Sequence, residues 1–377
     1  MNFLIAPNAL KGSLSAIDAA EVIARAIHEI LPDAKCRLSP IADGGDGTLD
    51  CLVQATGGEY VSSRTHGPLP SMEVTARWGI LGDKTTAVIE TAEAAGLRLL
   101  RPSEYNVMSG TTFGVGELIE QAARHGCSKI LVGLGGSATN DGGMGCCRAL
   151  SAKFFDRNGS ELEEGGKNLQ LLHRIEFTKE RSVIKQATIV GLSDVTNVLC
   201  GPAGAAFTFA PQKGATPEEV RRLDDNLRHY ASIIERDMHR QVSDVPGSGA
   251  AGGLGAGLIA FCDATIESGI NFVLDLVGFD ERVKQCDCII TAEGKIDAQT
   301  LNGKGIDGVA RRAKKWNKPV HAFAGRIGGD RIILQSQLGL SSLVEISPEA
   351  IEIEEAMKNA GVLLSNKIKE RFPTLKL

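Results

Sequence analysis

Polar and ionisable side chains gather directly after four short segments that have the composition of buried β-strands. The groups are Asn8, Lys11 and Ser13 after residues 2–6; Ser137, Thr139, Asn140 and Asp141 after residues 129–134; Ser193, Asp194 and Asn197 after residues 188–192; and Glu293, Lys295 and Asp297 after residues 287–292. In an open α/β sheet, ligands bind beyond the carboxyl ends of the strands. Because the groups combine carboxylates, amides, hydroxyls and amines, they predict a site for a phosphorylated ligand and a metal ion.

Glycine is frequent, with 44 residues in 377 against a typical share of about 7%, and it is clustered. One cluster, Gly135–Gly143, joins a predicted strand to a helix. Backbone N–H groups in such a turn bind anions, and glycine lets the backbone approach a phosphate without a Cβ in the way. Ser, Thr, Asn and Asp are interleaved with these glycines, which favours a phosphate-binding loop over the structural alternative of a tight turn without a ligand.

A second glycine cluster, Gly247–Gly252, matches the spacing G-x-G-x-x-G. A dinucleotide-binding fold needs a strand before this motif and an acidic residue after the next strand. Here Pro246 precedes it, and residues 254–262 predict a helix with no strand behind it. We therefore expect a glycine-rich helix entry, close-packed or touching a phosphate, rather than a nicotinamide site. A P-loop is excluded because Lys304 lacks both the upstream Gly and the following Ser or Thr.

Phosphoryl transfer needs carboxylates that hold a divalent metal, cations that neutralise the moving phosphate, and a positioned acceptor hydroxyl. The candidate carboxylates are Asp43, Asp194, Glu293 and Asp297, and the candidate cations are Lys11, Lys213, Lys295 and Lys304. Each has a structural alternative, since an Asp after a strand commonly caps a turn and a lone Lys is commonly solvated. Their place beside glycine turns favours function. The seven histidines have no partner at catalytic spacing, and none is assigned.

Composition excludes several classes of protein. With 41 Lys+Arg against 46 Asp+Glu, the net charge is −5, which argues against a protein devoted to coating nucleic acid, because that needs a surplus of basic residues. No apolar run reaches the roughly 18 residues of a membrane span. The amino terminus lacks a secretory leader, so a cytoplasmic location is expected. Nine scattered cysteines without metal-ligand spacing predict reduced thiols.

Short apolar strands alternate with amphipathic helices, which is typical of α/β folds. A helix is expected from Ser15, with Asp18 as its acidic N3 residue, until Pro32 ends it. Another begins at Thr216, with Glu219 at N3. The remaining expected elements are helices over 112–125 and 349–370, an antiparallel pair of strands at 72–80 and 85–90, and strands at 35–39, 319–324 and 343–346.

The two ends of the chain both show βα alternation, whereas the middle contains hairpin-like strands and most of the glycine clusters. We therefore expect two α/β domains. One is a discontinuous, Rossmann- or flavodoxin-like three-layer domain made of residues 1–65 and 285–377. The other, residues 66–284, is inserted into it.

Six segments of the chain resemble a known family. They run from Ala6 to Ala16, Ala42 to Thr48, Gly133 to Gly143, Phe209 to Ala215, Val245 to Gly253 and Glu293 to Thr300. In sequence and in order they are similar to the bacterial glycerate kinases of the class that gives 2-phosphoglycerate. The likeness extends from residue 3 to about residue 325, and its motifs are too long for chance or a shared fold alone.

The resemblance implies an active site in the cleft between two domains and ATP-dependent phosphorylation of D-glycerate with Mg²⁺. It places the ATP phosphates near Gly135, Gly136, Ser137, Thr139, Asn140, Asp141, Gly252 and Gly253. It also implies substrate contacts from Ser13, Lys213 and Glu293. Lys11 would bind the glycerate carboxylate or reach the γ-phosphate.

The resemblance further implies a metal site at Asp194, with help from Asp43 or Asp297. One of these three carboxylates would align and deprotonate the acceptor hydroxyl, and the choice among them stays open. Lys11 and the three carboxylates together form the expected catalytic set.

Several positions depart from the family pattern. The family usually has Asp, Ser, Glu and Gly where this chain has Asn8, Ala9, Asp46 and Ala292, and often Pro where it has Ile306. Asn8 matters most, because a neutral amide cannot replace a carboxylate that holds a metal or takes a proton. Two alternatives follow: a non-catalytic sensor of glycerate or nucleotide, or a kinase for a related hydroxy acid. In each case the expected partners are small molecules, without nucleic acid or membrane, and a homo-oligomer is compatible with the sequence.

Overall fold

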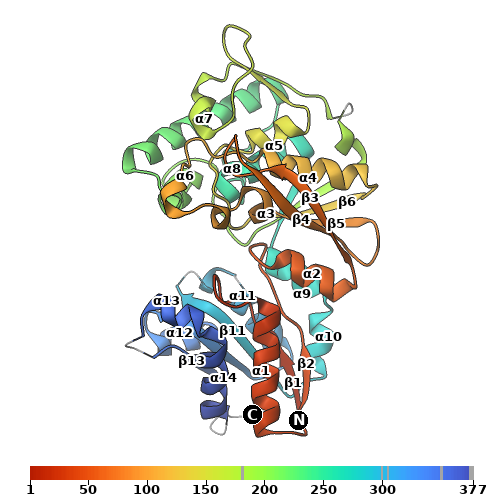
Figure 1. Cartoon of the computed structure of the whole chain (residues 1–377), viewed down its shortest axis with the longest axis vertical. Coiled ribbons are helices and arrows are strands. Elements are labelled where there is room, and N and C mark those ends of the chain that lie inside the picture. The colour runs from red at the N-terminus through yellow and green to blue at the C-terminus, as the bar shows by residue number, and fades with distance from the viewer. Residues whose placement is uncertain (180–181, 299, 304, 349–350, 373–377) are drawn as a thin grey trace. The chain divides into compact units, whose positions relative to one another are not determined.

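The computed structural model describes residues 1–179, 182–298, 300–303, 305–348 and 351–372 (Figure 1). The chain divides into two compact units, each with its own sheet. The first unit consists of Met1–Ala55 and Gly269–Leu377, and the inserted unit is Thr56–Ser268. The sequence-based division placed these boundaries at 65/66 and 284/285. The strand over 59–66 counts with the inserted unit because it pairs along its whole length with the strand that follows it.

The sheet of the first unit contains five parallel strands in the order β13-β12-β11-β1-β2. Their bounds are β1 Asn2–Ile5, β2 Lys35–Leu38, β11 Cys288–Asp297, β12 Val320–Gly328 and β13 Ser342–Glu345. Numbered within this unit alone, the order is 2-1-3-4-5, which is the flavodoxin-like arrangement. This confirms the predicted flavodoxin-like fold of the discontinuous domain.

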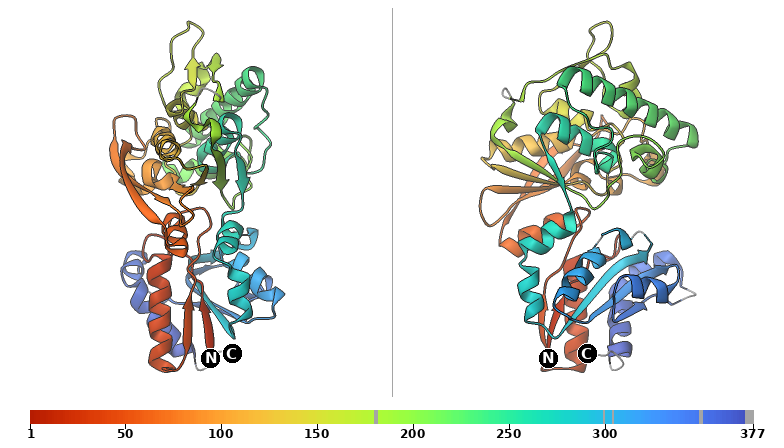
Figure 2. Two further views of the ribbon diagram at one scale, coloured as in Figure 1. Left: turned by 90° about the vertical axis from the view of Figure 1, so that its right-hand side faces the viewer. Right: turned by 180° about the vertical axis from the view of Figure 1, so that it is seen from behind.

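Helices cover both faces of this sheet and make it a three-layer unit (Figure 2). On one face α1 (Ala16–Ile30) packs against α14 (Ala360–Arg371), and their apolar residues share a core with β1 and β11. On the other face α11 (Gly305–Lys315) contacts β11 and β12. The remaining helices of this unit are α2 (Thr48–Thr56), α9 (Gly269–Leu276), α10 (Phe279–Lys284), α12 (Arg331–Gln337) and α13 (Ile353–Lys358).

Local sequence explains where α1 begins. The Ser15 side chain accepts a hydrogen bond of 3.0 Å from the Asp18 backbone N–H, which confirms the predicted cap. The single helix predicted over 349–370 is wrong. The chain forms α13 and α14 instead, because Asn359 leaves helical geometry and its side chain donates to the Glu355 carbonyl. The predicted start at residues 349–350 lies outside the described residues.

The inserted unit contains a six-stranded mixed sheet in the order β10-β9-β6-β5-β4-β3. Its bounds are β3 Glu59–His66, β4 Glu73–Ile80, β5 Thr86–Glu90, β6 Lys129–Gly133, β9 Thr188–Leu192 and β10 Thr265–Glu267. The pairing of β4 with β5 confirms the predicted antiparallel pair. From β5 to β10 the neighbouring strands are parallel, so their carboxyl ends share one edge.

The helices of the inserted unit surround this sheet and enclose a large hydrophobic core. Their bounds are α3 Thr91–Ala95, α4 Phe113–Arg124, α5 Met144–Ala149, α6 Ala205–Phe209, α7 Pro217–Met238 and α8 Ala250–Cys262, and a small hairpin pairs β7 (Lys153–Phe155) with β8 (Arg174–Glu176). No helix within the described residues combines the length and the apolar character that crossing a bilayer requires.

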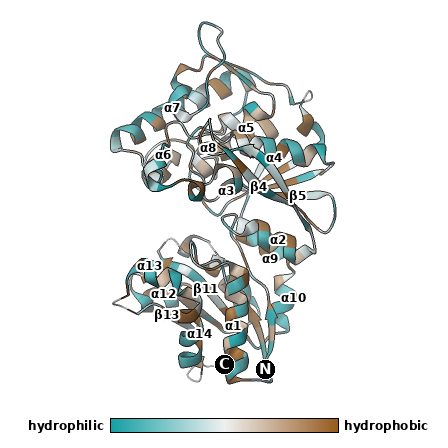
Figure 3. Cartoon of the chain, in the orientation of Figure 1, coloured by the Kyte–Doolittle hydropathy of each residue, from teal (hydrophilic) through white to brown (hydrophobic). Residues whose placement is uncertain are grey.

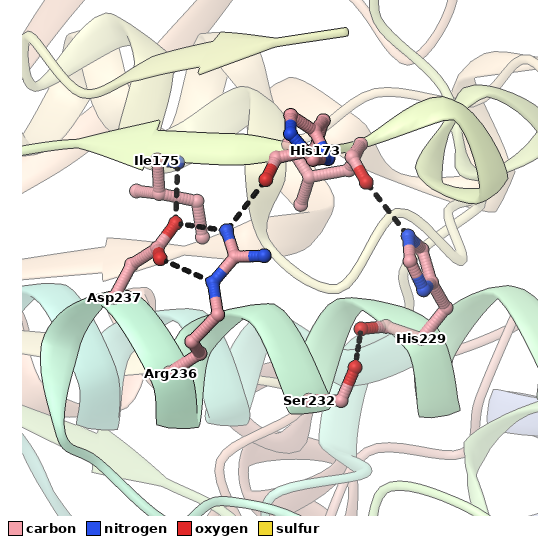
Figure 4. Close-up of polar contacts among 7 residues, drawn as sticks. His173, Ile175, His229, Ser232, Arg236 and Asp237 are labelled. Atoms are coloured by element: carbon pink, nitrogen blue, oxygen red, sulfur yellow. Dashed lines mark hydrogen bonds and ion pairs between the residues drawn. The ribbon is translucent and has the colours of Figure 1, made fainter. Parts of the chain in front are cut away.

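Helix α7 shows how the sequence sets both the start and the attachment of an element. Thr216 and Glu219 form the predicted capping box at its start. Teal, the colour of hydrophilic residues, predominates along this helix in Figure 3. Near its end Asp237 accepts from the Ile175 backbone N–H at 2.8 Å, and His229 lies 2.7 Å from the Leu172 carbonyl (Figure 4). These contacts fasten the helix to the β8 hairpin and give His229 a structural role.

Candidate active site

A cavity of about 600 Å³ lies at the carboxyl ends of β1, β11, β12 and β13 in the first unit. Its polar lining is Asn8, Lys11, Ser13, Asp43, Asp46, Glu293, Lys295, Arg326 and Ser347, and its apolar lining includes Leu10, Ile346, Ile353, Ala356, Met357 and Ala360. β1 and β11 are neighbours at the point where the strand order reverses. Doubly wound sheets bind their ligands at this point, so the cavity is the leading candidate for a substrate site.

The turn after β1 brings Lys11 and Ser13 to the cavity. Gly12 has a φ of +76°, which favours glycine, and Ser13 Oγ donates to the Leu10 carbonyl at 2.8 Å. Gly294 of β11 packs closely here, since a Cβ on it would lie 3.0 Å from the Lys11 backbone nitrogen. Lys11 itself is 77% exposed, with its Nζ 3.7 Å from Asp46 Oδ2. The backbone of this turn is fixed, while the Lys11 amine can still reach a ligand.

Asn8 lines the same cavity and is buried, at 7% exposure. Its Oδ1 accepts from the Ala9 backbone N–H at 2.8 Å. Its Nδ2 faces the beginning of α11, where a Cβ on Gly305 would lie 2.8 Å away. The most important departure from the family pattern therefore sits in the pocket itself.

Three carboxylates line this cavity, from Asp43, Asp46 and Glu293. No group of three or more His, Cys, Asp or Glu side chains among the described residues is arranged to hold a metal by itself. Mg²⁺ is usually bound by one or two carboxylates together with substrate phosphates and water. The acidic lining therefore fits a magnesium ion that arrives with its nucleotide. Asp297 does not line the cavity, and its Oδ2 lies 3.0 Å from Lys295 Nζ.

The strand expected to end near residue 292 continues to Asp297, so the sequence-based end of this strand was wrong. β11 and β12 pair with each other beyond the end of β1, and Lys295 lies in register with Arg326. In-register residues of parallel strands point to the same side of the sheet, and both line the cavity. Arg326 was not among the site residues predicted from the sequence. Its position two residues after the predicted strand 319–324 is the signal that could have identified it.

Arg326 is fixed by three groups at the rim of the cavity. Its guanidinium lies 3.2 Å from Glu345 Oε1 and donates to the carbonyls of Ile351 at 2.9 Å and Pro348 at 3.5 Å. The candidate cation Lys304 lies outside the described residues.

In the inserted unit, Asp194 lies two residues after the end of β9, at the carboxyl edge of the parallel strands. It is half-buried, and its Oδ1 accepts a hydrogen bond of 2.7 Å from Ser268 Oγ at the end of β10. Asp43 belongs to the first unit, so the magnesium site expected from Asp194 and Asp43 together stays a prediction.

Asp141 lies inside the inserted unit rather than at its surface, with 0% exposure. Its Oδ2 accepts from the backbone N–H and hydroxyl of Thr112, both at 2.9 Å, and from the Gly145 N–H at 3.1 Å. Its Oδ1 accepts from the Gly143 N–H at 3.0 Å. Burial raises the pKa of this carboxyl although all four donors act to lower it. Asp141 therefore braces the starts of α4 and α5, and these contacts do not need a ligand.

The two glycine clusters pack on each other. A Cβ on Gly252 would lie 2.0 Å from the Thr139 carbonyl oxygen, and the Gly142 N–H donates to the Gly252 carbonyl at 3.1 Å. Ala251, Gly252 and Gly253 all have positive φ, and turns rather than a strand precede them at 243–249. The segment is thus a glycine-rich helix entry as expected, and of the two alternatives left open, close-packed or touching a phosphate, this structure shows the close packing. Thr139 and Asn140 are buried, so solvent reaches the first loop mainly at Gly135 and Gly136.

Lys213 is buried at 3% exposure, and its Nζ donates to Ser137 Oγ at 3.0 Å and to the Thr139 carbonyl at 2.6 Å. Burial lowers its pKa to about 7, although the negative charge of Asp141 acts in the opposite direction. The amine therefore tethers the Gly135–Gly143 loop in this structure. The substrate contact expected for Lys213 stays a prediction.

Replacing Lys213 with Met should change how stability depends on pH. The unfolded chain holds this proton up to a pKa near 10.5, whereas the folded chain releases it at about 7. Between these values the unfolded state binds more protons, so the free energy of unfolding rises with pH, by up to about 1.4 kcal/mol per pH unit. The variant should lack this rise. Urea unfolding of both proteins at pH 7.0, 7.8 and 8.6 measures the difference.

The exposed Lys185 of the same unit offers a matched control, since Lys185→Met should keep the wild-type pH dependence. Equal slopes for wild type and Lys213→Met would show that the folded amine keeps its proton through this range.

Comparisons with known proteins agree over the whole chain. A family model described as the glycerate kinase family matches residues 3–376. A protein of Escherichia coli named glycerate 2-kinase is 42% identical over 360 residues, covering 96% of this chain and 94% of its own. A protein of Bacillus subtilis named glycerate kinase is 40% identical over 377 residues, covering 100% and 98%. A crystal structure from Salmonella typhimurium LT2, whose description names glycerate kinase 2, superposes with a TM-score of 0.83 at 40% identity, covering 100% and 98%.

Proposed function

Because this chain belongs to the glycerate kinase family, we propose that it transfers the γ-phosphoryl group of ATP to the 2-hydroxyl of D-glycerate and releases 2-phosphoglycerate and ADP. The membership confirms the resemblance found in the sequence and the enzyme class, a kinase. The 2-phosphate product, the use of Mg²⁺ and the residue roles below are the proposal.

The observation that carries the proposal is the cavity at the switch point of the first unit. It gathers the cations Lys11, Lys295 and Arg326 and the carboxylates Asp43, Asp46 and Glu293 around one space. Kinases rely on positioning and on electrostatic stabilisation of charge on the transferred phosphate. A cavity that holds amines and carboxylates at the ends of rigid strands supplies both.

Lys11 is proposed to bind a negatively charged group on one of the two substrates. Its amine is exposed and stands 3.7 Å from Asp46, so it can turn from that weak ion pair to the glycerate carboxylate or the γ-phosphate. An exposed ion pair contributes only about 0–1 kcal/mol, and exchanging it for a ligand contact costs little.

Asp43 is proposed as the base. Among the three carboxylates that the sequence left open, Asp43 lines the cavity that Lys11 lines. Its Oδ1 accepts a long bond of 3.3 Å from the Gly45 N–H. The 2-hydroxyl of glycerate gives its proton to this carboxylate as its oxygen forms a bond to the γ-phosphorus, and the bond from that phosphorus to ADP breaks. Mg²⁺ held by carboxylate and phosphate oxygens would neutralise charge on the ATP phosphates.

A coupled ADP-release assay with MgATP and D-glycerate, L-glycerate or no acid tests the reaction. We expect ADP only with D-glycerate, and phosphorus NMR of the product should show phosphate on the 2-oxygen. A phosphate on the 3-oxygen would contradict the regiochemistry but not the kinase. Release with tartronate or erythronate in place of D-glycerate would favour a related hydroxy acid as the substrate.

The same assay separates the enzyme from a sensor. Folded wild-type protein that releases no ADP with any acid, while Asn8→Asp gains activity, would support the non-catalytic alternative. Activity in the wild type would show that the Asn8 amide, held by the Ala9 N–H in this structure, is compatible with catalysis.

A further inference from the structure

The cavity of the first unit has two chemically distinct halves. The polar half lies at the ends of β1 and β11. The apolar half follows β13 and is lined by Ile346, Ile353, Ala356, Met357 and Ala360, which come from the end of that strand and from α13 and α14. None of these apolar residues lies in a segment that resembles the family motifs.

A small hydroxy acid does not account for this apolar half. Each carbon of D-glycerate carries an oxygen, so the acid offers no apolar surface to bury. The cavity volume of about 600 Å³ falls in the range of about 300–1,000 Å³ that holds drug-sized ligands, and a three-carbon acid would fill only a small part of it.

The polar half places three cations beside the three carboxylates Asp43, Asp46 and Glu293, which is more cationic groups than the single carboxylate of the acid would pair with. Three cations, Lys11, Lys295 and Arg326, line the cavity. A chain of phosphates carries several negative charges along its length and suits a row of cations. A ligand with a flat aromatic ring at one end and a chain of phosphates at the other matches both halves of the cavity.

We infer that the first unit binds the nucleotide itself: the adenine base lies against the wall formed by Ile353, Ala356 and Met357, and the phosphates extend towards Lys11 and Lys295. The inference deepens the proposed function, since it names where the phosphate donor of that reaction binds. The burial of Thr139, Asn140 and Asp141 supports it, because those residues of the glycine loop contact protein in this structure.

The side chains of this wall are aliphatic and can pack against the face of a flat ring. Ile353 is 67% exposed and Met357 38% exposed, while Ala356 and Ala360 are buried. A flexible thioether adapts to a planar ligand. Arg326 donates to the carbonyl of Ile351, two residues before Ile353, so the cationic half is tied to the segment that leads into the apolar wall.

Calorimetric titration with two ligands isolates the base. ADP offers both base and phosphates, whereas inorganic pyrophosphate offers phosphates alone, and both are measured with MgCl₂. Ala356→Leu should fill the space beside the wall and weaken ADP binding at least tenfold, while pyrophosphate affinity stays within twofold. Ile353→Ser, at an exposed position, should weaken ADP binding by a smaller factor without a change in folding.

Val362→Leu is the matched control, because Val362 of α14 is 61% exposed and does not line the cavity. It should leave both affinities unchanged. Wild-type affinity for ADP in both wall variants, or equal losses for ADP and pyrophosphate, would overturn the inference. So would a wild type that fails to bind ADP.

Kinetics with D-glycerate keep the two proposals separate. If the wall binds adenine, Ala356→Leu raises the KM for ATP and leaves the KM for D-glycerate within twofold. A raised KM for the acid alone would assign the wall to the acid and overturn the inference, while the proposed reaction stands. If the wild type phosphorylates no acid, the reaction fails, and the ADP titrations still decide where the nucleotide binds.

Discussion

Asp194→Asn should lower kcat at least a hundredfold, which corresponds to about 2.7 kcal/mol of barrier. The carboxylate follows β9 at the edge where the parallel strands of the inserted unit end, the position expected for ligand-binding groups. An amide has the same shape and its oxygen can still accept from Ser268 Oγ, the partner 2.7 Å from Oδ1. The substitution therefore removes charge and leaves the local structure intact. Steady-state assays at saturating MgATP and D-glycerate measure the effect.

Two further variants separate charge from structure at this position. Ser268→Ala removes the hydrogen bond but keeps the carboxylate, and should cost less than tenfold in kcat. Asp225→Asn removes a carboxylate from the exposed side of α7 and should change nothing. Turnover within threefold of wild type in Asp194→Asn would remove this residue from the metal site and the mechanism.

Asp141→Ala should lower the free energy of unfolding of the inserted unit by about 3 kcal/mol or more. The substitution leaves three backbone N–H groups and the Thr112 hydroxyl without their acceptor in a fully buried place. A buried donor that loses its partner costs about 1–3 kcal/mol, and relaxation or an entering water recovers part of the sum. Urea denaturation monitored by circular dichroism measures the loss.

Asp141→Asn should cost less than Asp141→Ala. The amide oxygen can take the place of Oδ2, which accepts three of the four bonds, and the neutral group avoids the desolvation that raises the pKa of Asp141. Asp225→Ala serves as the control on α7. If the two Asp141 variants proved as stable as the control, the carboxylate would have no bracing role, and a ligand-binding role would return to consideration.

The sequence alone determined the elements whose signals are local. Ser15 and Thr216 cap α1 and α7 as predicted, because a capping hydrogen bond joins residues three apart and needs nothing from the rest of the chain. The βα alternation at both ends similarly predicted the flavodoxin-like unit. The rule that ligands bind beyond strand ends selected Asn8, Lys11 and Glu293, and all three line the cavity.

Only the tertiary structure decided which of the polar groups line a cavity. Asp141 and Lys213 have the residue types and positions of site residues, yet both are buried and bonded to protein. Their surroundings come from distant segments, such as Gly252 packed on the Thr139 carbonyl, and spacing along the chain does not report such contacts.

Folding also decided how far β11 extends, where Arg326 lies, and that apolar side chains of α13 line the cavity. β11 continues past β1 because β12 extends beside it. Ile353 and Met357 line the cavity because α13 comes after β13 in the chain, and the end of β13 also borders the cavity. Local sequence determines caps and turns through neighbouring residues. Burial and the shape of a cavity depend on segments far apart in the chain, so they are decided only when those segments pack.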